Sequence, residues 1–356
     1  MTDSSRYHAR RSRLKAAIAA NDLDALVVTH PVNVTYLTGF TGSNGQIVVT
    51  AADSSVDTLF TDRRYEGRVQ TDTDLNVTYG PFLPAILATP GTVGMEAQHV
   101  SWASARQLLV DSQAKRVTLS PTTNMVEELR QYKDSYEHAQ LTAACQITVD
   151  ALNHLFEHTR LEGVSERAIA HTLQQIMQDF GADGDAFAPI VATGVNGAIP
   201  HHSPTDRIVA KGELLTIDCG ARLNGYHADC TRTVAIGTAP NSELAAIYAV
   251  VRDAQQAATA ALTANTTAGE VDDAARSVIE TAGYGAAFVH GTGHGVGLEI
   301  HEAPLIGPKA TARLQATVVC TSEPGIYLPG VGGVRIEDTV VVTASGAPQI
   351  LTDCPR

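Results

Sequence analysis

The sequence predicts an α/β (α+β) protein of two domains, a small N-terminal domain and a larger C-terminal one. The chain has 356 residues, and domains commonly have ~100–200. Over the first third, short apolar segments alternate with stretches of helical period. Beyond residue 130, one arrangement of helix, loop and strand pair occurs twice, which indicates a domain built from two similar halves.

The first third predicts short α/β units. A helix is expected near residues 8–21, a strand at 24–29, and a turn-rich stretch over 33–50 that ends in a strand. Residues 58–70 should run from strand into helix, 95–110 should be helical, and 115–120 should form a strand. One long helix is expected over 127–158, with the domain boundary near residue 130, so that the domains span 1–130 and 131–356. Five basic residues are expected on the solvated face of the first helix: Arg6, Arg10, Arg11, Arg13 and Lys15.

Composition and charge argue against several classes of partner. The formal net charge is −13, and such a chain has no general attraction to phosphate backbones or anionic lipid, so we expect no nucleic-acid or membrane partner. No segment approaches the ~18 apolar residues of a membrane helix, and no cleavable signal follows the basic N-terminus. The five cysteines form no C-x-x-C pair, which favours reduced thiols and a cytoplasmic location.

The two copies in the C-terminal part each carry acids on a strand pair. The first copy has a helix at 165–180, a histidine loop at 190–206 and strands around Asp218 and Asp229. The second has a helix at 270–283, a glycine- and histidine-rich stretch at 288–304 and strands around Glu323 and Glu337. Each acid alone is compatible with a cap, a turn or a salt bridge. Four carboxylates gathered in one cleft would repel one another, and divalent metal would relieve that repulsion.

Histidines complete the candidate metal site. The segment HGTGHGVGLEIHE contains His290, His294 and His301 among four glycines, which allow tight turns and close backbone approach. His201 and His202 follow Pro200. One imidazole with four carboxylates is an oxygen-rich set that suits manganese, cobalt or iron better than structural zinc. Two such ions ~3.5–4 Å apart can generate a bridging hydroxide for attack on a carbonyl.

The ordered motifs IPHHSPTD, LLTIDCG, GYHADCTRT, HGTGHGVGLEIHE, TSEPGIY and GGVRIEDT resemble the pita-bread metallopeptidase family. That family includes aminopeptidase P, proline dipeptidase, methionine aminopeptidase and creatinase. The stretches YLTGFTGSNG and TDRRY are similar to the creatinase-like N-terminal domain of the aminopeptidase P and proline dipeptidase branch. The resemblance implies a small N-terminal α/β domain that serves assembly and shapes the cleft, followed by a pseudo-symmetric pita-bread catalytic domain.

The resemblance also implies roles for individual residues. The metal ligands would be Asp218, Asp229, His294, Glu323 and Glu337. Among them Asp218 would bind one ion, His294 and Glu323 the other, and Asp229 and Glu337 would bridge the two. Glu323 would also act as acid–base. The remaining assignments are His201 and His301 as catalytic histidines, His290 and Arg335 as substrate-side residues with Arg335 orienting carboxylates, and Tyr226 and Thr231 as supports, with a core role equally open for Tyr226.

The implied activity is hydrolysis of the Xaa-Pro bond by a dinuclear exopeptidase, with two Mn²⁺ ions or alternatively Co²⁺, Fe²⁺ or Zn²⁺. Proline-containing peptides would be the substrates and a homodimer the expected assembly. Proline dipeptidases often have an arginine where this chain has Leu305, which favours an aminopeptidase that accepts longer peptides. Two alternatives are a creatinase-like hydrolase of a small non-peptide substrate and a non-catalytic binding module. The full ligand set argues against both.

Overall fold

The computed structural model describes residues 3–52, 57–88, 91–113, 116–344 and 346–354. These residues form two compact units, Met1–Arg130 and Gln131–Arg356. Within the described ranges, no helix combines the length and the apolar character that crossing a membrane requires.

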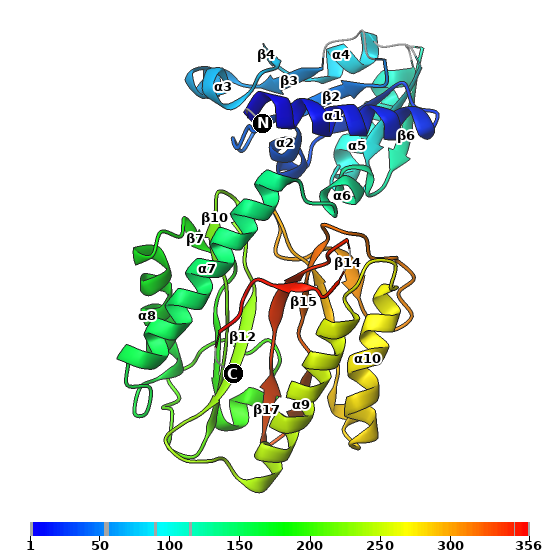
Figure 1. The fold of residues 1–356 in the computed structure, drawn as a ribbon. Helices are drawn as coiled ribbons and strands as arrows, with labels where there is room; N and C mark the ends of the chain where they lie inside the picture. Colours follow the sequence, from blue (N-terminus) through cyan, green and yellow to red (C-terminus); the bar gives the residue numbers. More distant parts are fainter. Residues whose placement is uncertain (1–2, 53–56, 89–90, 114–115, 345, 355–356) are drawn as a thin grey trace. The chain divides into compact units, whose positions relative to one another are not determined.

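The N-terminal unit is built on one six-stranded mixed sheet with the order β4-β3-β2-β1-β5-β6 (Figure 1). β1 runs antiparallel to β2 and parallel to β5. Apolar residues on the strands, such as Val27, Phe60 and Val93, form its core. The elements are α1 (Asp3–Ala20), β1 (Ala25–Val28), α2 (Pro31–Thr38), β2 (Gln46–Thr50), β3 (Thr58–Thr61), η1 (Arg63–Tyr65), α3 (Glu66–Asp72), β4 (Asn76–Tyr79), α4 (Leu83–Ala88), β5 (Gly91–Glu96), α5 (Trp102–Gln113), β6 (Val117–Thr122) and α6 (Met125–Arg130).

The expectation of a solvated basic face on α1 is wrong for three of its residues, because Arg6, Arg10 and Arg11 are buried. Arg10 donates to the carbonyl oxygen of Tyr36 and Arg11 to that of Leu37, each at 2.9 Å. These carbonyls lie in the last turn of α2, where the helix leaves its acceptors unpaired and its dipole favours cations. The two arginines therefore fasten α1 to the end of α2.

Two expected helices also differ in extent. Residues 95–100 end β5 and form a turn, and α5 begins only at Trp102. The long helix expected over 127–158 is two helices, because Asp134 starts a new one at α7 (Ser135–His158). The Asp134 carboxylate accepts from the amides of Tyr136 and Glu137, and Glu137 accepts from the amide of Asp134. This capping box begins α7, whereas the first helix, α6, has already ended at Arg130.

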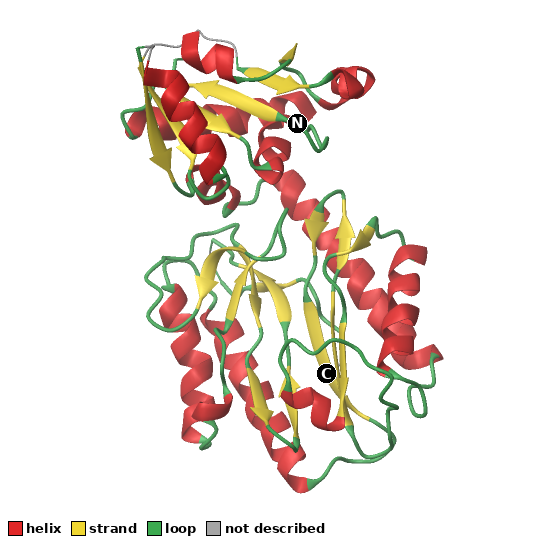
Figure 2. Cartoon of the chain, turned by 180° about the vertical axis from the view of Figure 1, so that it is seen from behind, coloured by secondary structure: helices red, strands yellow, loops and turns green. Residues whose placement is uncertain are grey.

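The C-terminal unit has two halves, each a set of strands covered by a pair of helices (Figures 1 and 2). The first half contains α7, α8 (Glu166–Asp179), β7 (Gly184–Asp185), β8 (Ile190–Thr193), η2 (Gly194–Ala198), β9 (Leu214–Cys219), β10 (Ala221–Leu223), β11 (Tyr226–His227) and β12 (Cys230–Ala235). The second contains α9 (Ser242–Ala261), α10 (Ala268–Thr281), η3 (Gly285–Ala287), β13 (Gly293–Gly295), β14 (Glu302–Ile306), β15 (Val319–Ser322), β16 (Gly325–Leu328), β17 (Gly332–Arg335), β18 (Asp338–Val341) and β19 (Gln349–Ile350).

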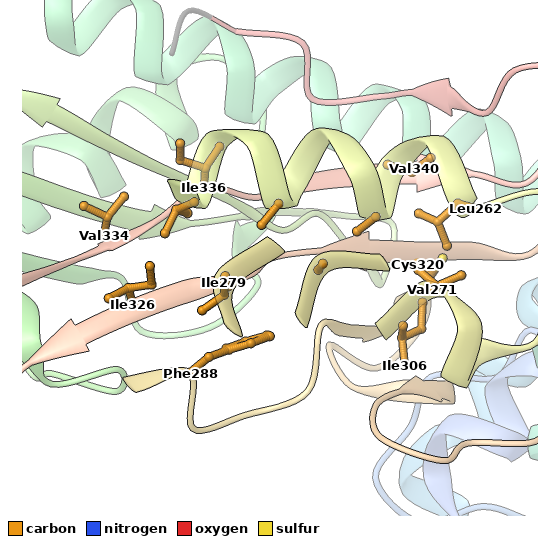
Figure 3. Packing of buried hydrophobic residues seen from close by; sticks show 14 of the residues in the cluster. Leu262, Val271, Ile279, Phe288, Ile306, Cys320, Ile326, Val334, Ile336 and Val340 are labelled. Atoms are coloured by element: carbon orange, nitrogen blue, oxygen red, sulfur yellow. The ribbon is translucent and has the colours of Figure 1, made fainter. Parts of the chain in front are cut away.

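Each half has its own apolar core. In the first, Leu152 of α7 and Leu173 of α8 belong to the same buried cluster as Ile217 of β9. In the second, Val271 of α10 lies in one cluster with Val340 of β18 (Figure 3). Since the helices cover one face of each set of strands, the polar side chains of the strands are left for the opposite face. The predicted two-half architecture is confirmed, and those polar side chains build the site.

Candidate metal centre

The acids of the first half are placed by the hairpin of β9 and β12. Asp218 lies within β9 opposite Thr231, and the next pair is Cys219 with Cys230. Asp229 directly precedes β12. Because neighbouring side chains on a strand point to opposite faces, the two cysteines enter the apolar core while the acids face away from it. Both cysteines are free and buried, and they serve as small packing residues.

The acids of the second half lie where its strands break. Glu323 directly follows β15, and Glu337 lies between β17 and β18. Thr231 of the first half holds Glu337 twice: its carbonyl accepts from the Glu337 amide at 3.1 Å and its hydroxyl donates to Oε2 at 2.7 Å. Thr339 returns the contact, donating to the carbonyl oxygen of Asp229 at 2.8 Å. The acids of the two halves thus meet across a reciprocal pair of threonines.

His294 enters this group from β13, the strand between β14 and β15. A Cβ atom at Gly293 or Gly295 would collide with the backbone carbonyl of Thr321 or Ala303, so glycine is required on both sides of His294. Nδ1 of His294 donates to the carbonyl oxygen of Gly295 at 3.1 Å, which leaves Nε2 to face the acids. Nε2 lies 3.2 Å from Oε1 of Glu323 and 3.5 Å from Oδ2 of Asp229.

The four carboxylates around His294 carry more negative charge than the protein groups beside them neutralise. Burial, together with repulsion from neighbouring carboxylates, raises the pKa of Asp218, Asp229 and Glu337. Burial also opposes ionisation of Glu323, but the hydrogen bond from His294 and its charge lower the pKa of Glu323 to about 2. The imidazole of His294 and the guanidinium of Arg335, which contacts Asp218, cannot balance four carboxylates, so at least part of the group would stay protonated without further positive charge.

The residues present fit divalent metal ions. Ligand atoms of Asp229, His294 and Glu337 lie within 4.8 Å of one another. Oδ1 of Asp218 and Oε1 of Glu337 are buried and have no hydrogen-bond partner, although buried carboxylate oxygens are normally satisfied. The donor set of carboxylate oxygens and one imidazole is the hard, oxygen-rich type that Mn²⁺ accepts.

Arg335 connects this group to a tyrosine that the sequence analysis left without a role. Its guanidinium donates to Oδ2 of Asp218 at 2.6 Å, to the hydroxyl of Thr231 at 3.1 Å and to the hydroxyl of Tyr327 at 2.9 Å. Tyr327 in turn lies 2.8 Å from Nε2 of His290. Nδ1 of His290 donates to a carbonyl oxygen, so Nε2 of the neutral ring accepts from Tyr327. Burial lowers the pKa of His290, which favours that neutral ring.

The register of one hairpin explains why Tyr327 faces Arg335. Tyr327 lies two residues beyond Gly325, and Gly325 pairs with Arg335 in the β16–β17 hairpin, so strand alternation puts Tyr327 and Arg335 on one face. The register of that hairpin could not be derived without the structure. Tyr226 does not support the candidate metal ligands. Its ring is buried against Tyr136, and its hydroxyl donates to Glu137, which is not one of the candidate ligands. The core alternative for Tyr226 is therefore correct.

A cavity of about 700 Å³ opens over the acids. All the candidate ligands line it, as do His201, His290, His301 and Arg335. His201 and His301 are exposed, and the ring of His301 stands edge-on to that of His294 at 4.4 Å. The remaining walls of the cavity are mostly apolar, and they include Phe187, Pro189, Ile190, Ile300, Leu305 and Pro308. The cavity therefore joins a charged floor to mostly apolar walls, a combination that is typical of ligand-binding and active sites.

A second possible ligand group occurs in the N-terminal unit. His30, His99 and Glu127 have ligand atoms within 4.8 Å of one another. The two imidazoles, however, stack at 3.7 Å with planes only 9° apart, so their in-plane lone pairs run parallel and do not converge on one point. His99 instead pairs with Glu127 at 3.3 Å. We assign no ion to this group.

Buried carboxylates around one imidazole, open to a substrate-sized cavity, define a metal-dependent hydrolase. Comparison with known proteins identifies the family. Residues 139–344 match metallopeptidase family M24, and residues 10–132 match the creatinase/prolidase N-terminal domain. The chain belongs to family M24, with the pita-bread catalytic domain, and it is a metallopeptidase whose family implies divalent metal ions.

Similar proteins cover nearly the whole chain. The Xaa-Pro dipeptidase of Pyrococcus furiosus is 35% identical, over 96% of this chain and 97% of its own. Among solved structures, the Xaa-Pro dipeptidase from Bacillus anthracis aligns with a TM-score of 0.92 at 31% identity, covering 98% of both chains. The X-Pro aminopeptidase from Thermotoga maritima aligns at 0.87 and 33% identity, over 97% of this chain and 98% of that one.

Proposed function

We propose that this protein is an exopeptidase that hydrolyses the peptide bond in front of proline. The observation that carries the proposal is the cavity whose floor is formed by three buried carboxylates, the partly buried Glu323 and His294, and whose walls include four further histidines. Relatives over nearly the full length are named Xaa-Pro dipeptidase and X-Pro aminopeptidase, which supports this choice of substrate. An Xaa-Pro bond has no amide hydrogen, so an enzyme that cleaves it cannot hold the bond by a hydrogen bond from its nitrogen, whereas activation of the carbonyl does not need that hydrogen.

Two divalent ions, with Mn²⁺ as our first choice, would be held by Asp218, Asp229, His294, Glu323 and Glu337. When bound, such a pair of ions polarises the carbonyl of the scissile bond and lowers the pKa of the attacking water. Their positive charge would also allow the neighbouring carboxylates to ionise together. The ions would give the buried oxygens Oδ1 of Asp218 and Oε1 of Glu337, which have no hydrogen-bond partner, a favourable interaction.

The chain's own groups would handle the proton and the developing charge. Glu323 would accept the proton that the attacking water loses and deliver it to the leaving proline nitrogen. His201, exposed in the cavity, would donate to the oxygen of the tetrahedral intermediate. His290, neutral and hydrogen-bonded to Tyr327, would stand beside the proline ring, and His301 would contact the substrate from the other wall.

We propose that peptides longer than two residues are good substrates. Among the described residues that line the cavity, Arg335 is the only Lys or Arg. Its donors already engage Asp218, Thr231 and Tyr327, so it offers no ready site for the carboxylate of a dipeptide. Leu305 lines the cavity with 68% of its surface exposed. An apolar wall there suits a further residue of a peptide better than a carboxylate.

We also propose a homodimer in the cytoplasm. Two-fold assemblies are the commonest among soluble oligomers, and the N-terminal unit, which provides none of the proposed ligands, would serve assembly. The five cysteines are all free and buried, as expected where thiols stay reduced. Light scattering at micromolar concentration would test the assembly: a mass near one chain would contradict it.

A peptide panel tests the activity. Ala-Pro, Ala-Pro-Phe and Ala-Ala-Phe would be offered to protein stripped with a chelator, with and without added Mn²⁺. We expect cleavage of the two proline peptides only, only with metal, and at least as fast for the tripeptide. Cleavage of Ala-Ala-Phe at an equal rate would contradict the proline specificity. A stripped protein with full activity would contradict the role of the metal.

A further inference from the structure

A fully buried carboxylate outside the metal group collects more hydrogen bonds than any ligand acid does. Glu166 is the first residue of α8, and none of its side chain is exposed. Oε1 accepts from the amide of Thr193 and from Nδ2 of Asn196, both at 2.9 Å. Oε2 accepts from Nε2 of His202 at 2.9 Å, and from the amide and hydroxyl of Thr205 at 3.0 and 2.6 Å.

This carboxylate is held as an anion. Burial opposes ionisation, but the hydrogen bonds from Thr205, His202, Thr193 and Asn196 outweigh it and lower the pKa of Glu166. Hydrogen bonds to a charged acceptor in a low-dielectric interior are about twice as strong as neutral ones. Glu166 is not among the residues that line the cavity, so its charge does not meet the substrate.

The segments tied to Glu166 are those that carry the first catalytic histidine. Thr193 ends β8, which pairs with β9 at Ile190 and Asp218. His202 immediately follows His201, and on the other side the carbonyl oxygen of Pro200 accepts from Arg335 at 3.2 Å. His201 is therefore an exposed side chain between two anchored neighbours.

We propose that Glu166 is a positioning residue that, through His202, fixes the loop presenting His201 to the substrate carbonyl. The proposal rests on the proposed function of His201 as an oxyanion donor. A donor placed in advance costs no reorganisation when the charge develops, and a displacement of about 1 Å can lower the rate by ~10²-fold. Glu166 supplies that placement from outside the cavity, through His202, which lines the cavity wall.

The second half offers a matched control. Asp272 of α10 is also fully buried and accepts from the amide and hydroxyl of Thr292, at 3.1 and 2.8 Å, and from Arg276. Arg276 in turn donates to the carbonyl oxygen of His290 at 2.9 Å. Asp272 thus anchors the loop of His290 and leaves the loop of His201 untouched.

A double-mutant cycle on kcat/KM for Ala-Pro-Phe, with manganese-loaded enzyme, tests the proposal. Glu166→Gln should lower kcat/KM by ~10–100-fold in the wild-type background, mainly through kcat, and by less than about threefold when His201 is already alanine. Asp272→Asn should give the same factor in both backgrounds. An equal factor for Glu166→Gln in both backgrounds would show that Glu166 acts on overall structure alone and would overturn the proposal.

Amide hydrogen exchange gives a readout that does not depend on activity. Glu166→Gln, or the milder Thr205→Val if the first variant folds poorly, should speed exchange over residues 196–205 and leave residues 290–295 unchanged. Unchanged exchange over residues 196–205 would contradict the anchoring. If the wild-type protein cleaves no Xaa-Pro peptide, the proposed function fails, and with it the role of Glu166 in positioning His201 for catalysis. The exchange result would then still decide whether Glu166 anchors the loop.

Discussion

The two halves of the catalytic unit provide equivalent acids by different means. In the first half, β9 and β12 pair over six consecutive positions, and Asp218 lies inside this hairpin. In the second half the corresponding chain is divided between two ladders, β15 with β18 and β16 with β17. Glu323 and Glu337 lie where one ladder gives way to the other. One continuous hairpin thus places Asp218 within its ladder and Asp229 directly at its end, whereas breaks between two ladders place Glu323 and Glu337.

This difference makes the second half depend on the first. Glu337, outside a ladder, is held through its amide and its Oε2 by Thr231. The hydroxyl of Thr339, the counterpart of Thr231, donates to the backbone carbonyl of Asp229 instead of to a carboxylate. The halves therefore share one architecture, but the support for their carboxylates is unequal, and variants on the two sides should expose the inequality.

The largest effect should come from an acid that both proposed ions share. We expect Asp229→Ala to lose both ions and at least ~10³-fold in kcat, since a bridging ligand contributes to each ion. Glu337→Ala, its counterpart in the other half, should behave alike. Elemental analysis after manganese loading and desalting measures the first effect and peptide hydrolysis the second. If either variant kept both ions, the proposed bridging role of that acid would be wrong.

His201→Ala should come next. Removing an oxyanion donor should lower kcat by ~10²–10³-fold and leave the metal content unchanged. His202→Ala, which removes only one of the contacts of Glu166, should be milder. Parallel losses of metal and activity in His201→Ala would instead make His201 a ligand or a structural residue.

Leu305→Arg adds the cation that the cavity wall lacks. It should shift the ratio of kcat/KM for Ala-Pro over Ala-Pro-Phe by a few-fold to ~100-fold, which is the range of a charge-assisted hydrogen bond. Leu305→Met is the control of similar volume without the charge, and it should leave that ratio nearly unchanged. A wild-type enzyme that cleaves dipeptides and no tripeptide would contradict the expected preference.

Two threonine variants, whose effect on activity should be indirect, test the unequal support. Thr231→Val removes a donor to a carboxylate and should weaken metal binding by ~10–100-fold. Thr339→Val removes a donor to a backbone carbonyl and should cost about 1 kcal/mol of unfolding free energy, with little change in metal affinity. Metal titration and denaturant unfolding of both variants separate the two outcomes. Equal loss of metal affinity would mean that the two threonines are equivalent.

The sequence was sufficient for much of this account because its signals are local. Acids among β-forming residues, glycines around His294 and the duplicated plan are all visible in the printed chain. The burial of Arg10 and Arg11 could not be predicted, because it depends on carbonyls at the end of α2 some 26 residues away. The same holds for Tyr327 and Glu166, whose partners come from other elements brought together only by the fold.

The most direct test of the central claim is a titration of metal-free protein with Mn²⁺, following bound metal and hydrolysis of Ala-Pro-Phe in the same samples. We predict that activity rises with metal and reaches its maximum at about two ions per chain, the number that a shared set of bridging carboxylates holds. Double substitution of Asp229 and Glu337 by alanine should abolish both signals. Full activity before any metal is added, or in that double variant, would contradict the account.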